Sequence, residues 1–356
     1  MFEKIGNLQY SEKTRIIQIQ KKNLKDGINC VNDHFIVKNS KFFKIYNRIC
    51  DHAGGKIVSR KENHVCPIHN WKFFPINGKY ENGIKKKQIN FVDKGTILQF
   101  KETSLIPNIK KTAKKLNFKI KFMNHAFIKI ETKDFSFATD PWAFGPAFNN
   151  GWWLKKNTRN DWLEEVNDVD FIYISHNHPD HLHPLTLSKI DKKKNILIPN
   201  FQSKSTENFI SSLGFINIFK ADFNLEYKFI NQDFYFSLFK SGNFKDDSGI
   251  YFSLGDFTSL IDVDSQNINF DNLPIVDLYG SSFGGGARGY PWVFENYNQK
   301  DQIQINDRSQ KFFLKRKIDN IKKMKTKFFL PYASYFEEKL PRDRRIKLLN
   351  KKIDFI

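Results

Sequence analysis

The chain has 356 residues, of which 40% are apolar and 15% aromatic, and 58 basic against 38 acidic side chains give a formal net charge of +20. At about 150 residues per domain, this length predicts two or three domains and excludes a miniature with one small core. No run approaches the roughly 18 apolar residues of a membrane span, and the first residues lack the apolar segment of a signal peptide. We therefore expect a cytoplasmic protein with no membrane span.

Charge and cysteine usage bear on the partners and the redox setting. A positive field favours anionic partners such as nucleotides, acidic lipids or acidic redox proteins. Lysine is spread over nearly every segment, which indicates a global composition bias rather than a nucleic-acid-binding stripe, so we expect no nucleic-acid partner. The three cysteines, Cys30, Cys50 and Cys66, are too few and odd in number for a disulfide framework, which favours reduced thiols or metal ligands.

The first part of the chain is predicted to be a small all-β domain. Short runs of β-type composition are separated by turn residues such as Lys25-Asp26-Gly27 and Asn77-Gly78. The predicted strands are residues 15–20, 34–37, 42–46 and 95–100. The pattern changes near residue 105, because Pro107 can open a helix that runs to Leu116. We therefore divide the chain into domains at residues 1–104 and 105–356.

Beyond this boundary, strands alternate with helices. The predicted strands are residues 118–122, 126–131, 170–175, 234–239, 249–254, 258–263 and 327–330, and the predicted helices are residues 161–166, 184–190 and 206–213. A basic helix near the end has an apolar face formed by Leu314, Ile318 and Ile321. This mixture predicts the α+β class for the chain as a whole.

Two loops of the first domain each combine one cysteine with one histidine. They are Cys50-Asp51-His52 and Cys66-Pro67-Ile68-His69, with the thirteen residues 53–65 between them. Two cysteines and two histidines are the ligand set of a Rieske 2Fe-2S cluster, whose neutral imidazoles raise the reduction potential. A Cys2His2 zinc site would use the same side chains, but zinc motifs usually pair Cys with Cys and His with His. We predict that Cys50, His52, Cys66 and His69 bind a 2Fe-2S cluster that relays electrons.

A second metal motif follows the apolar strand at residues 171–175. The loop His176-Asn177-His178-Pro179-Asp180-His181 has the spacing of the metallo-β-lactamase fold, in which His176 and His178 can hold one metal and Asp180 and His181 a second. We expect these four residues to be catalytic and the domain to be an αββα sandwich. The fold class is thus a two-domain α+β protein, with an N-terminal Rieske domain before a metallo-β-lactamase-like domain.

The later ligands of this second site are open, because no histidine occurs after His183. Carboxylates or water can fill these positions, or they stay empty. Asp264, at the end of the strand at 258–263, is the best candidate for a bridging carboxylate. Asp246 and Asp247 can replace the first missing histidine, although an exposed acidic turn is an equal alternative. His183 is expected either beside the site or on the surface.

Three further features are candidates for substrate binding. His125 precedes the turn Thr139-Asp140-Pro141-Trp142, and it is either part of the site or a buried, hydrogen-bonded histidine. The glycines around Gly285 can let the backbone approach a substrate, and Arg288 can pair with a phosphate or carboxylate. A tight turn with a solvated arginine is the alternative for these last residues.

A Rieske motif and a metallo-β-lactamase loop in one chain resemble the CMP-N-acetylneuraminate hydroxylase family. The likeness spans about residues 20–340. Stretches beyond the metal ligands that carry it are Asn23-Leu24-Lys25-Asp26-Gly27-Ile28-Asn29, Asp140-Pro141-Trp142, Gly151-Trp152-Trp153-Leu154, Phe283-Gly284-Gly285-Gly286-Ala287 and Pro331-Tyr332-Ala333-Ser334-Tyr335-Phe336. The family carries a histidine where Asn243-Phe244 stands here.

The resemblance implies a monooxygenase that hydroxylates the N-acetyl group of CMP-N-acetylneuraminate, or of a related sugar nucleotide such as UDP-muramic acid. It implies O2 as co-substrate, a 2Fe-2S cluster, and one or two non-haem irons at His176, His178, Asp180, His181 and Asp264. It also implies an electron-donor protein, either cytochrome b5-like or a ferredoxin with an NAD(P)H reductase. Because an unactivated C–H bond needs a metal that reduces O2, two metal stations suit this chemistry.

Two other functions remain open. A metallo-hydrolase, such as a lactonase or phosphodiesterase, would hold zinc in the second site and activate water. That function leaves the Cys and His loops without a task. An electron-transfer protein with a degenerate second site is the non-enzymatic alternative, because the late histidines are missing.

Overall fold

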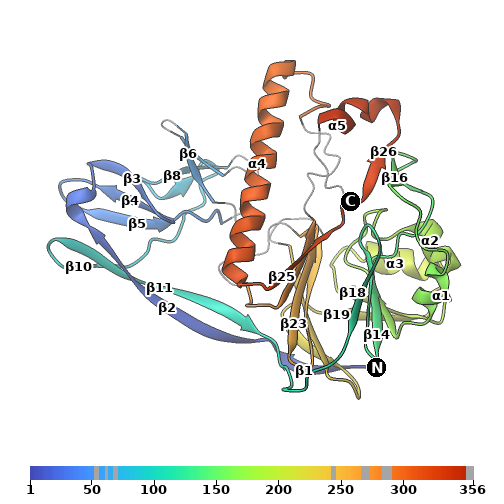
Figure 1. Cartoon of the computed structure of the whole chain (residues 1–356). Coiled ribbons are helices and arrows are strands. Elements are labelled where there is room, and N and C mark those ends of the chain that lie inside the picture. The colour runs from blue at the N-terminus through green and yellow to red at the C-terminus, as the bar shows by residue number, and fades with distance from the viewer. Residues whose placement is uncertain are drawn as a thin grey trace.

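The computed structural model describes residues 1–51, 56–60, 63–66, 71–241, 246–265, 273–282 and 291–349. Figure 1 shows two parts, a small one rich in strands and a larger one with two sheets and peripheral helices, joined by a long two-stranded ribbon. Among the described residues, no helix combines the length and apolarity needed to cross a bilayer.

The smaller part consists of two antiparallel sheets. The first orders β3 (Gly27–Val31), β4 (His34–Lys38) and β5 (Phe43–Asn47), and the second orders β6 (Val58–Arg60), β7 (Asn63–Val65), β8 (Lys72–Phe74) and β9 (Lys79–Tyr80). Its described helical content is one short 3-10 turn, Lys21–Asn23. The side chains of Phe35, Phe73 and Tyr80 are buried together with Cys50 and Cys66 in one hydrophobic cluster. The predicted strands 34–37 and 42–46 are thus confirmed within a residue or two.

The connecting ribbon pairs β2 (Gln9–Gln20) with β11 (Ile97–Asn108), and β10 (Val92–Asp93) extends it at one end. Most residues of β2 are exposed. The predicted helix from Pro107 to Leu116 is wrong: Pro107 lies in β11 opposite Tyr10, and the described chain after Asn108 is irregular up to β12. A proline is tolerated there because the ribbon has a free edge where no backbone N–H is required.

The ribbon bears on where the boundary between the two parts of the chain lies. Residue 105 falls inside β11, and β1 (Phe2–Asn7) does not pack with the smaller part. Instead β1 pairs antiparallel with β20 (Leu225–Phe229), at the edge of the larger part. The chain therefore starts in the larger part, crosses to the smaller part along β2 and returns along β11 (Figure 1).

The larger part is built from two mixed sheets. One orders β1, β20, β21 (Phe234–Lys240), β22 (Ser248–Leu254), β23 (Phe257–Val263), β24 (Leu278–Ser282) and β25 (Phe328–Tyr332). The other orders β12 (Lys119–Asn124), β13 (Phe127–Glu131), β14 (Ser136–Thr139), β17 (Phe171–Tyr173), β18 (Asn195–Pro199) and β19 (Asn217–Ala221). A small third sheet joins β15 (Pro146–Ala147), β16 (Trp152–Leu154) and β26 (Phe336–Glu338).

An aromatic core fills the space between the two sheets. Phe137 and Phe171 stack at 5.0 Å between ring centroids, and Phe234 lies 5.2 Å from Phe137. Burying each such ring stabilises the fold by about 1.5–3 kcal/mol relative to exposure. Residues of both sheets contribute to this single cluster, so the sheets pack face to face.

Helices cover the outer faces of both sheets. α1 (Trp162–Asn167), α2 (Pro184–Lys189) and α3 (Ser205–Ser212) enclose a second cluster on the six-stranded sheet. The long α4 (Gln299–Met324) covers the seven-stranded sheet, where Met324 and Ile321 join a third cluster. The 3-10 turn Pro341–Asp343 and α5 (Arg344–Leu349) follow β26. These layers give the αββα sandwich that the sequence predicted.

Candidate metal centre

The loops at one end of the sandwich bring the predicted metal ligands together. Asp140 follows β14, and the loop from His176 to His181 follows β17, its parallel neighbour. Because carboxyl ends of parallel strands meet at one sheet edge, these loops lie side by side. From the other sheet, Asp247 precedes β22 and Asp264 follows β23. The site thus lies where loops of both sheets converge.

Local backbone distortion directs Asp264 toward this site. Val263, a β-branched residue, has φ of 48°, which is a rare conformation for such a side chain. The register of β23 against β24 also shifts between Ile261 and Val263. A bulge of this kind re-aims the residue that follows it. Asp264 consequently approaches His181, with 3.7 Å between Oδ2 and Nε2.

The first group of potential ligands is His176, His178 and Asp247. Nε2 of His176 lies 2.7 Å from Nδ1 of His178 and 3.8 Å from Oδ1 of Asp247. One ligand atom from each of the three residues lies within 4.8 Å of the others. His176 and Asp247 are buried and His178 is half-buried. Asp247, rather than its neighbour Asp246, therefore lies beside this histidine pair.

The second group is His125, Asp180 and His181. Nε2 of His125 lies 3.1 Å from Oδ2 of Asp180, and Nε2 of His181 lies 3.4 Å from the same oxygen. A third group, His176, His181 and Asp264, overlaps the other two. In the part of the chain that the structure describes, the buried atoms Nε2 of His181 and Oδ1 of Asp180 have no hydrogen-bond partner. Buried nitrogen and oxygen atoms that lack a hydrogen-bond partner are suited to bind a cation.

The charges of the second group favour a carboxylate and a cation in close contact. Burial raises the pKa of Asp180, but His181 and His125 outweigh it and hold that pKa well below its usual range. Burial likewise opposes charge on His181, yet Asp180 and Asp140 raise the pKa of His181 well above normal. For His125, burial dominates and lowers the pKa. Asp180 is therefore ionised and available to a positively charged partner.

Asp140 and Ser175 orient the ligands, and sequence reasoning missed both roles. Oδ2 of Asp140 accepts a hydrogen bond from Nδ1 of His181 at 3.0 Å and from the Ser175 hydroxyl at 2.7 Å. Because that hydroxyl donates to Asp140, it accepts from Nδ1 of His176, 2.9 Å away. Both imidazoles are thereby held with Nε2 facing the site, as in metal centres whose histidines are fixed by a carboxylate. The position of Asp140 directly after a strand was the available signal.

The remaining predicted residues have different outcomes. His125 was predicted to bind substrate, but it contacts Asp180 and joins a potential ligand group, so its position fits a metal or ligand-orienting role better. His183 is buried and caps α2, with Nδ1 accepting from the backbone N–H of Thr186 at 3.2 Å. Gly285 and Arg288 lie outside the described residues, so their substrate roles remain predictions.

The two described cysteines of the first motif lie together in the smaller part. Cys50 and Cys66 are buried in one hydrophobic cluster. His52 and His69 lie outside the described residues. Tyr80 hydrogen-bonds Cys50, and its hydroxyl accepts from the backbone N–H of Asp51 at 3.0 Å. Two buried thiols contributed by separate loops fit an iron–sulfur or zinc site, and hydrogen bonds to cluster sulfurs tune reduction potential.

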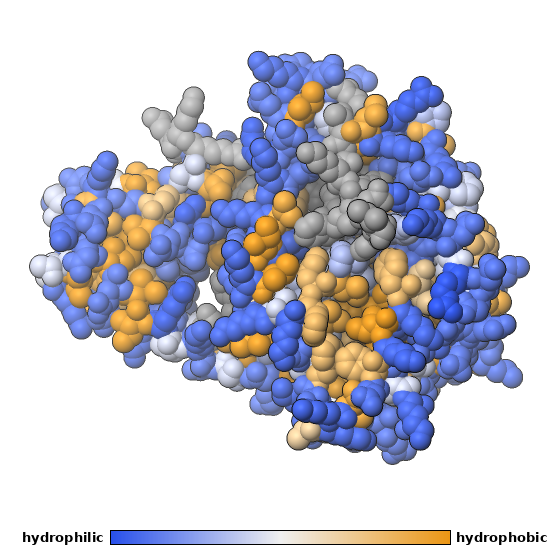
Figure 2. Space-filling view, viewed as in Figure 1, coloured by the Kyte–Doolittle hydropathy of each residue, from blue (hydrophilic) through white to orange (hydrophobic). Residues whose placement is uncertain are grey.

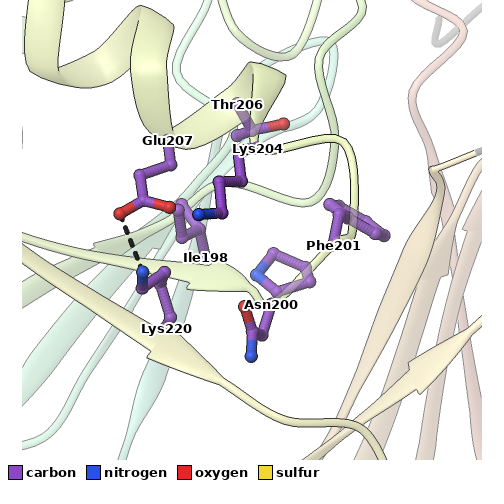
Figure 3. Close-up of a pocket in the computed structure, with 8 residues that line it drawn as sticks. Ile198, Asn200, Phe201, Lys204, Thr206, Glu207 and Lys220 are labelled. Carbon is purple, nitrogen blue, oxygen red and sulfur yellow. Dashed lines mark hydrogen bonds and ion pairs between the residues drawn. The ribbon is translucent and has the colours of Figure 1, made fainter.

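Two hollows lie near the candidate metal site of the larger part. An open depression of about 630 Å³ is lined by His178, Asp247, Asn177, Lys240 and other polar residues. Its size suits a small polar ligand next to the metal group. A second hollow, between Lys204 and the ion pair of Lys220 with Glu207, encloses about 10 Å³ (Figure 3). That space holds no more than about one water molecule, so the depression is the better substrate site.

Comparison with known families defines the class of the larger part. Residues 119–238 match the Beta-lactamase superfamily domain. This segment runs from β12 to β21 and contains the loop from His176 to His181. The matched segment, the αββα layers and the histidine–aspartate loop agree with one another. The larger part of the chain therefore contains a metallo-β-lactamase-fold domain with a candidate metal site.

The chain as a whole is similar to cytidine monophosphate-N-acetylneuraminic acid hydroxylases. It is 28% identical to that of Pongo pygmaeus over 365 residues, which cover 93% of this chain and 62% of the relative. It is 29% identical to that of Asterias rubens over 374 residues, which cover 93% of this chain and 57% of the relative. The predicted resemblance is thus confirmed along nearly the whole chain, and the chain spans about three fifths of the relatives' length.

A solved structure is also similar in part. It is CmlA, a diiron beta-hydroxylase from Streptomyces venezuelae, at 13% identity and a TM-score of 0.41, with 64% of this chain and 46% of that chain covered.

Proposed function

We propose that this protein is a Rieske-type, iron-dependent monooxygenase that hydroxylates the N-acetyl group of a nucleotide-activated sugar. The observation that carries the proposal is the group of His176, His178 and Asp247. Two histidines and one carboxylate with open positions are the ligand set of non-haem iron oxygenases. The resemblance to the hydroxylases along 93% of the chain supports the same reaction.

The carboxylate of Asp247 lies beside His176 and His178, and the metal proposed for this group is iron. Two histidines and one carboxylate hold zinc in some hydrolases and non-haem iron in oxygenases, so the reaction rather than the ligand set selects iron here. A redox-active iron bound there would supply the reductive activation of O2 that an inert C–H bond demands. A hydrolase would need only a metal-bound water and would leave Cys50 and Cys66 without a task.

The chain's own residues have separate tasks in this scheme. Cys50, His52, Cys66 and His69 would hold the 2Fe-2S cluster, which accepts single electrons from a donor protein of the cytochrome b5 or ferredoxin class. Asp180, His181, His125 and Asp264 would hold or orient a second metal beside the first. Asp140 accepts a hydrogen bond from Nδ1 of His181, which orients the imidazole so that Nε2 faces the site and would bind the metal.

The depression beside His178 is the proposed substrate site. Lys240, Asn177 and Ser203 offer donors for phosphate and sugar oxygens there. The formal net charge of +20 would also attract an anionic nucleotide sugar. Gly285 and Arg288 are proposed to approach the same substrate. We place the reaction in the cytoplasm, where activated sugars and reduced donors are available.

The test is product formation by the full chain with both metal sites loaded. Supplied with reductant and isotopically heavy O2, the protein should convert the N-acetyl group of CMP-N-acetylneuraminate or UDP-N-acetylmuramic acid to N-glycolyl with one heavy oxygen per product. Asp247→Asn should lose iron and product, whereas Asp246→Asn, its neighbour outside the potential ligand groups, should keep its iron. A zinc-loaded protein that hydrolyses esters and incorporates no heavy oxygen would contradict the proposal.

A further inference from the structure

Most lysines of this basic chain lie at the surface, and hydrophilic residues cover most of the face that Figure 2 shows. Among the residues that the structure describes, Lys86, Lys129 and Lys317 are buried instead. Lys129 pairs with Glu165 and Lys317 with Asp262, both in the larger part. Lys86 belongs to the smaller part. Burying an ammonium group is costly unless the group is paired and hydrogen-bonded, so the partners of Lys86 show what this residue holds in place.

The ammonium group of Lys86 is bonded to both neighbours of Cys50. Its Nζ donates to the carbonyl oxygen of Ile49 at 2.5 Å and to Oδ1 of Asp51 at 2.8 Å. The Tyr80 hydroxyl, 3.5 Å from Nζ, accepts from the backbone N–H of Asp51 at 3.0 Å. Given the bond to Ile49 and standard bond lengths, Nζ lies within about 8 Å of the Cys50 sulfur. Lys86 thus fixes the chain on both sides of a predicted cluster ligand and places a positive charge beside it.

The backbone around Lys86 holds the side chain in this place. The N–H of Lys86 donates to the carbonyl oxygen of Gly78 at 2.8 Å, and the preceding Lys85 forms a bridge with Lys79 of β9. Tyr80, in the same strand, belongs to the hydrophobic cluster that contains the two buried cysteines. Lys86 is therefore anchored to a strand that packs with the cysteines.

The two charges of the ion pair are exposed to water unequally. The side chain of Lys86 is 1% exposed and that of Asp51 is 45% exposed. Water and salt screen an exposed charge far more than a buried one. The ammonium group consequently dominates the field of the pair at Cys50, and that field is positive.

We propose that Lys86 is a positioning residue for the cluster ligand Cys50 and that its buried charge raises the reduction potential of the 2Fe-2S cluster. This inference rests on the proposed function, because it requires a cluster held by Cys50 and Cys66. Reduction by the donor protein adds one electron, and so one negative charge, to the cluster. A fixed positive charge beside a sulfur ligand stabilises that reduced form, and net charge is one of the factors that set cluster potentials. Asp51 acts in the opposite direction and more weakly.

The test measures the cluster potential of the full chain by redox titration followed by electron paramagnetic resonance. Lys86→Met, which keeps the length of the side chain, should lower the midpoint potential. Asp51→Asn, which keeps an oxygen acceptor for Lys86, should raise it by a smaller amount. Lys87→Met is the matched control, because it removes the same charge from the next, exposed position, and it should leave the potential unchanged. Opposite shifts from the two partners of one ion pair indicate an effect of charge, which a general loosening of the fold would not produce.

The outcomes separate this inference from the proposed function. A Rieske-type signal in the wild-type protein together with equal potentials for Lys86→Met and Lys87→Met would overturn the inference and leave the function standing. If Lys86→Met does not assemble a cluster, Asp51→Asn provides the test, and a potential equal to or below the wild-type value would overturn the inference. Absence of a cluster from the wild-type protein would overturn both.

Discussion

The substitution Asp140→Asn tests whether the metal centre is built as described. Asp140 is fully buried, and it accepts hydrogen bonds from the Ser175 backbone N–H, the Ser175 hydroxyl and Nδ1 of His181. Asparagine offers one oxygen and one NH2 group in the same volume. Whichever way the amide turns, its NH2 group faces at least one donor. With the NH2 group in the place of Oδ2, the imidazole of His181 gains by moving its proton to Nε2, which removes the lone pair from the site; in the other orientation the Ser175 N–H loses its acceptor.

The expected loss of metal affinity can be judged from other proteins in which the hydrogen-bond partner of a metal-bound histidine has been removed. Loss of such a partner typically weakens metal binding 10- to 100-fold, or about 1.4–2.8 kcal/mol. The two hydrogen bonds between Asp140 and Ser175 hold the loop as well, so the effect should lie toward the upper end of this range. The fold should persist, because the substitution changes no side-chain volume appreciably.

The assay is an anaerobic competition titration of Fe2+ against a coloured chelator, repeated with Zn2+. Asp134→Asn is the matched control, since Asp134 is an exposed aspartate on the hairpin between β13 and β14. The control should bind metal as the wild type does. An affinity for Asp140→Asn within about twofold of the wild type would refute the role assigned to this carboxylate.

Three further predictions concern stability and metal choice. Glu165→Gln removes the nearest of three carboxylates around buried Lys129, 2.7 Å away, while Glu131 and Asp168 remain, and should lower the free energy of unfolding by about 1.5–3 kcal/mol in urea titration at pH 7. Hydrogen bonds from Lys121 and Lys129 lower the pKa of Glu165. The stability that Glu165 contributes is therefore present above its unfolded-state pKa and is lost as the pH falls through its folded-state pKa. A difference in free energy of unfolding between wild type and Glu165→Gln that stays the same at acid pH would contradict this. Phe234→Ala, in the core between the sheets, should cost about 3–5 kcal/mol, and a loss below about 1 kcal/mol would show that the core is not packed as described. Asp247→His should shift metal preference toward zinc, which competitive loading followed by elemental analysis would show, and an unchanged iron-to-zinc ratio would count against the ligand role of Asp247.

The contiguous metal loop was predictable because its chemistry is local. His176, His178, Asp180 and His181 stand within six residues after an apolar strand, and the structure brings all of them to one place. Asp247 could be named only as one of two candidates, because an acidic pair in a turn has the same local pattern whether or not a site lies beside it. Its assignment depends on β22 lying opposite the loop, which no short-range pattern encodes.

The errors in the predicted fold have the same origin. The segment after Pro107 has helix-like spacing, yet Pro107 and Asn108 pair with β2 across the ribbon, and the described chain beyond them is irregular up to β12. The first strand, β1, joins the seven-stranded sheet of the larger part because β20 offers it a partner, although over two hundred residues separate the two strands. The contact of His125 with Asp180 depends on a turn with φ of 41° at His125 itself, a conformation that the sequence does not reveal, and its role toward substrate stays a prediction.

The measurement that tests the central claim most directly is metal analysis with electron paramagnetic resonance on the full chain, purified anaerobically and reduced with dithionite. We expect a Rieske-type signal together with more iron per chain than the two atoms of one cluster. Zinc in the second site with no cluster signal would contradict the oxygenase and favour a hydrolase.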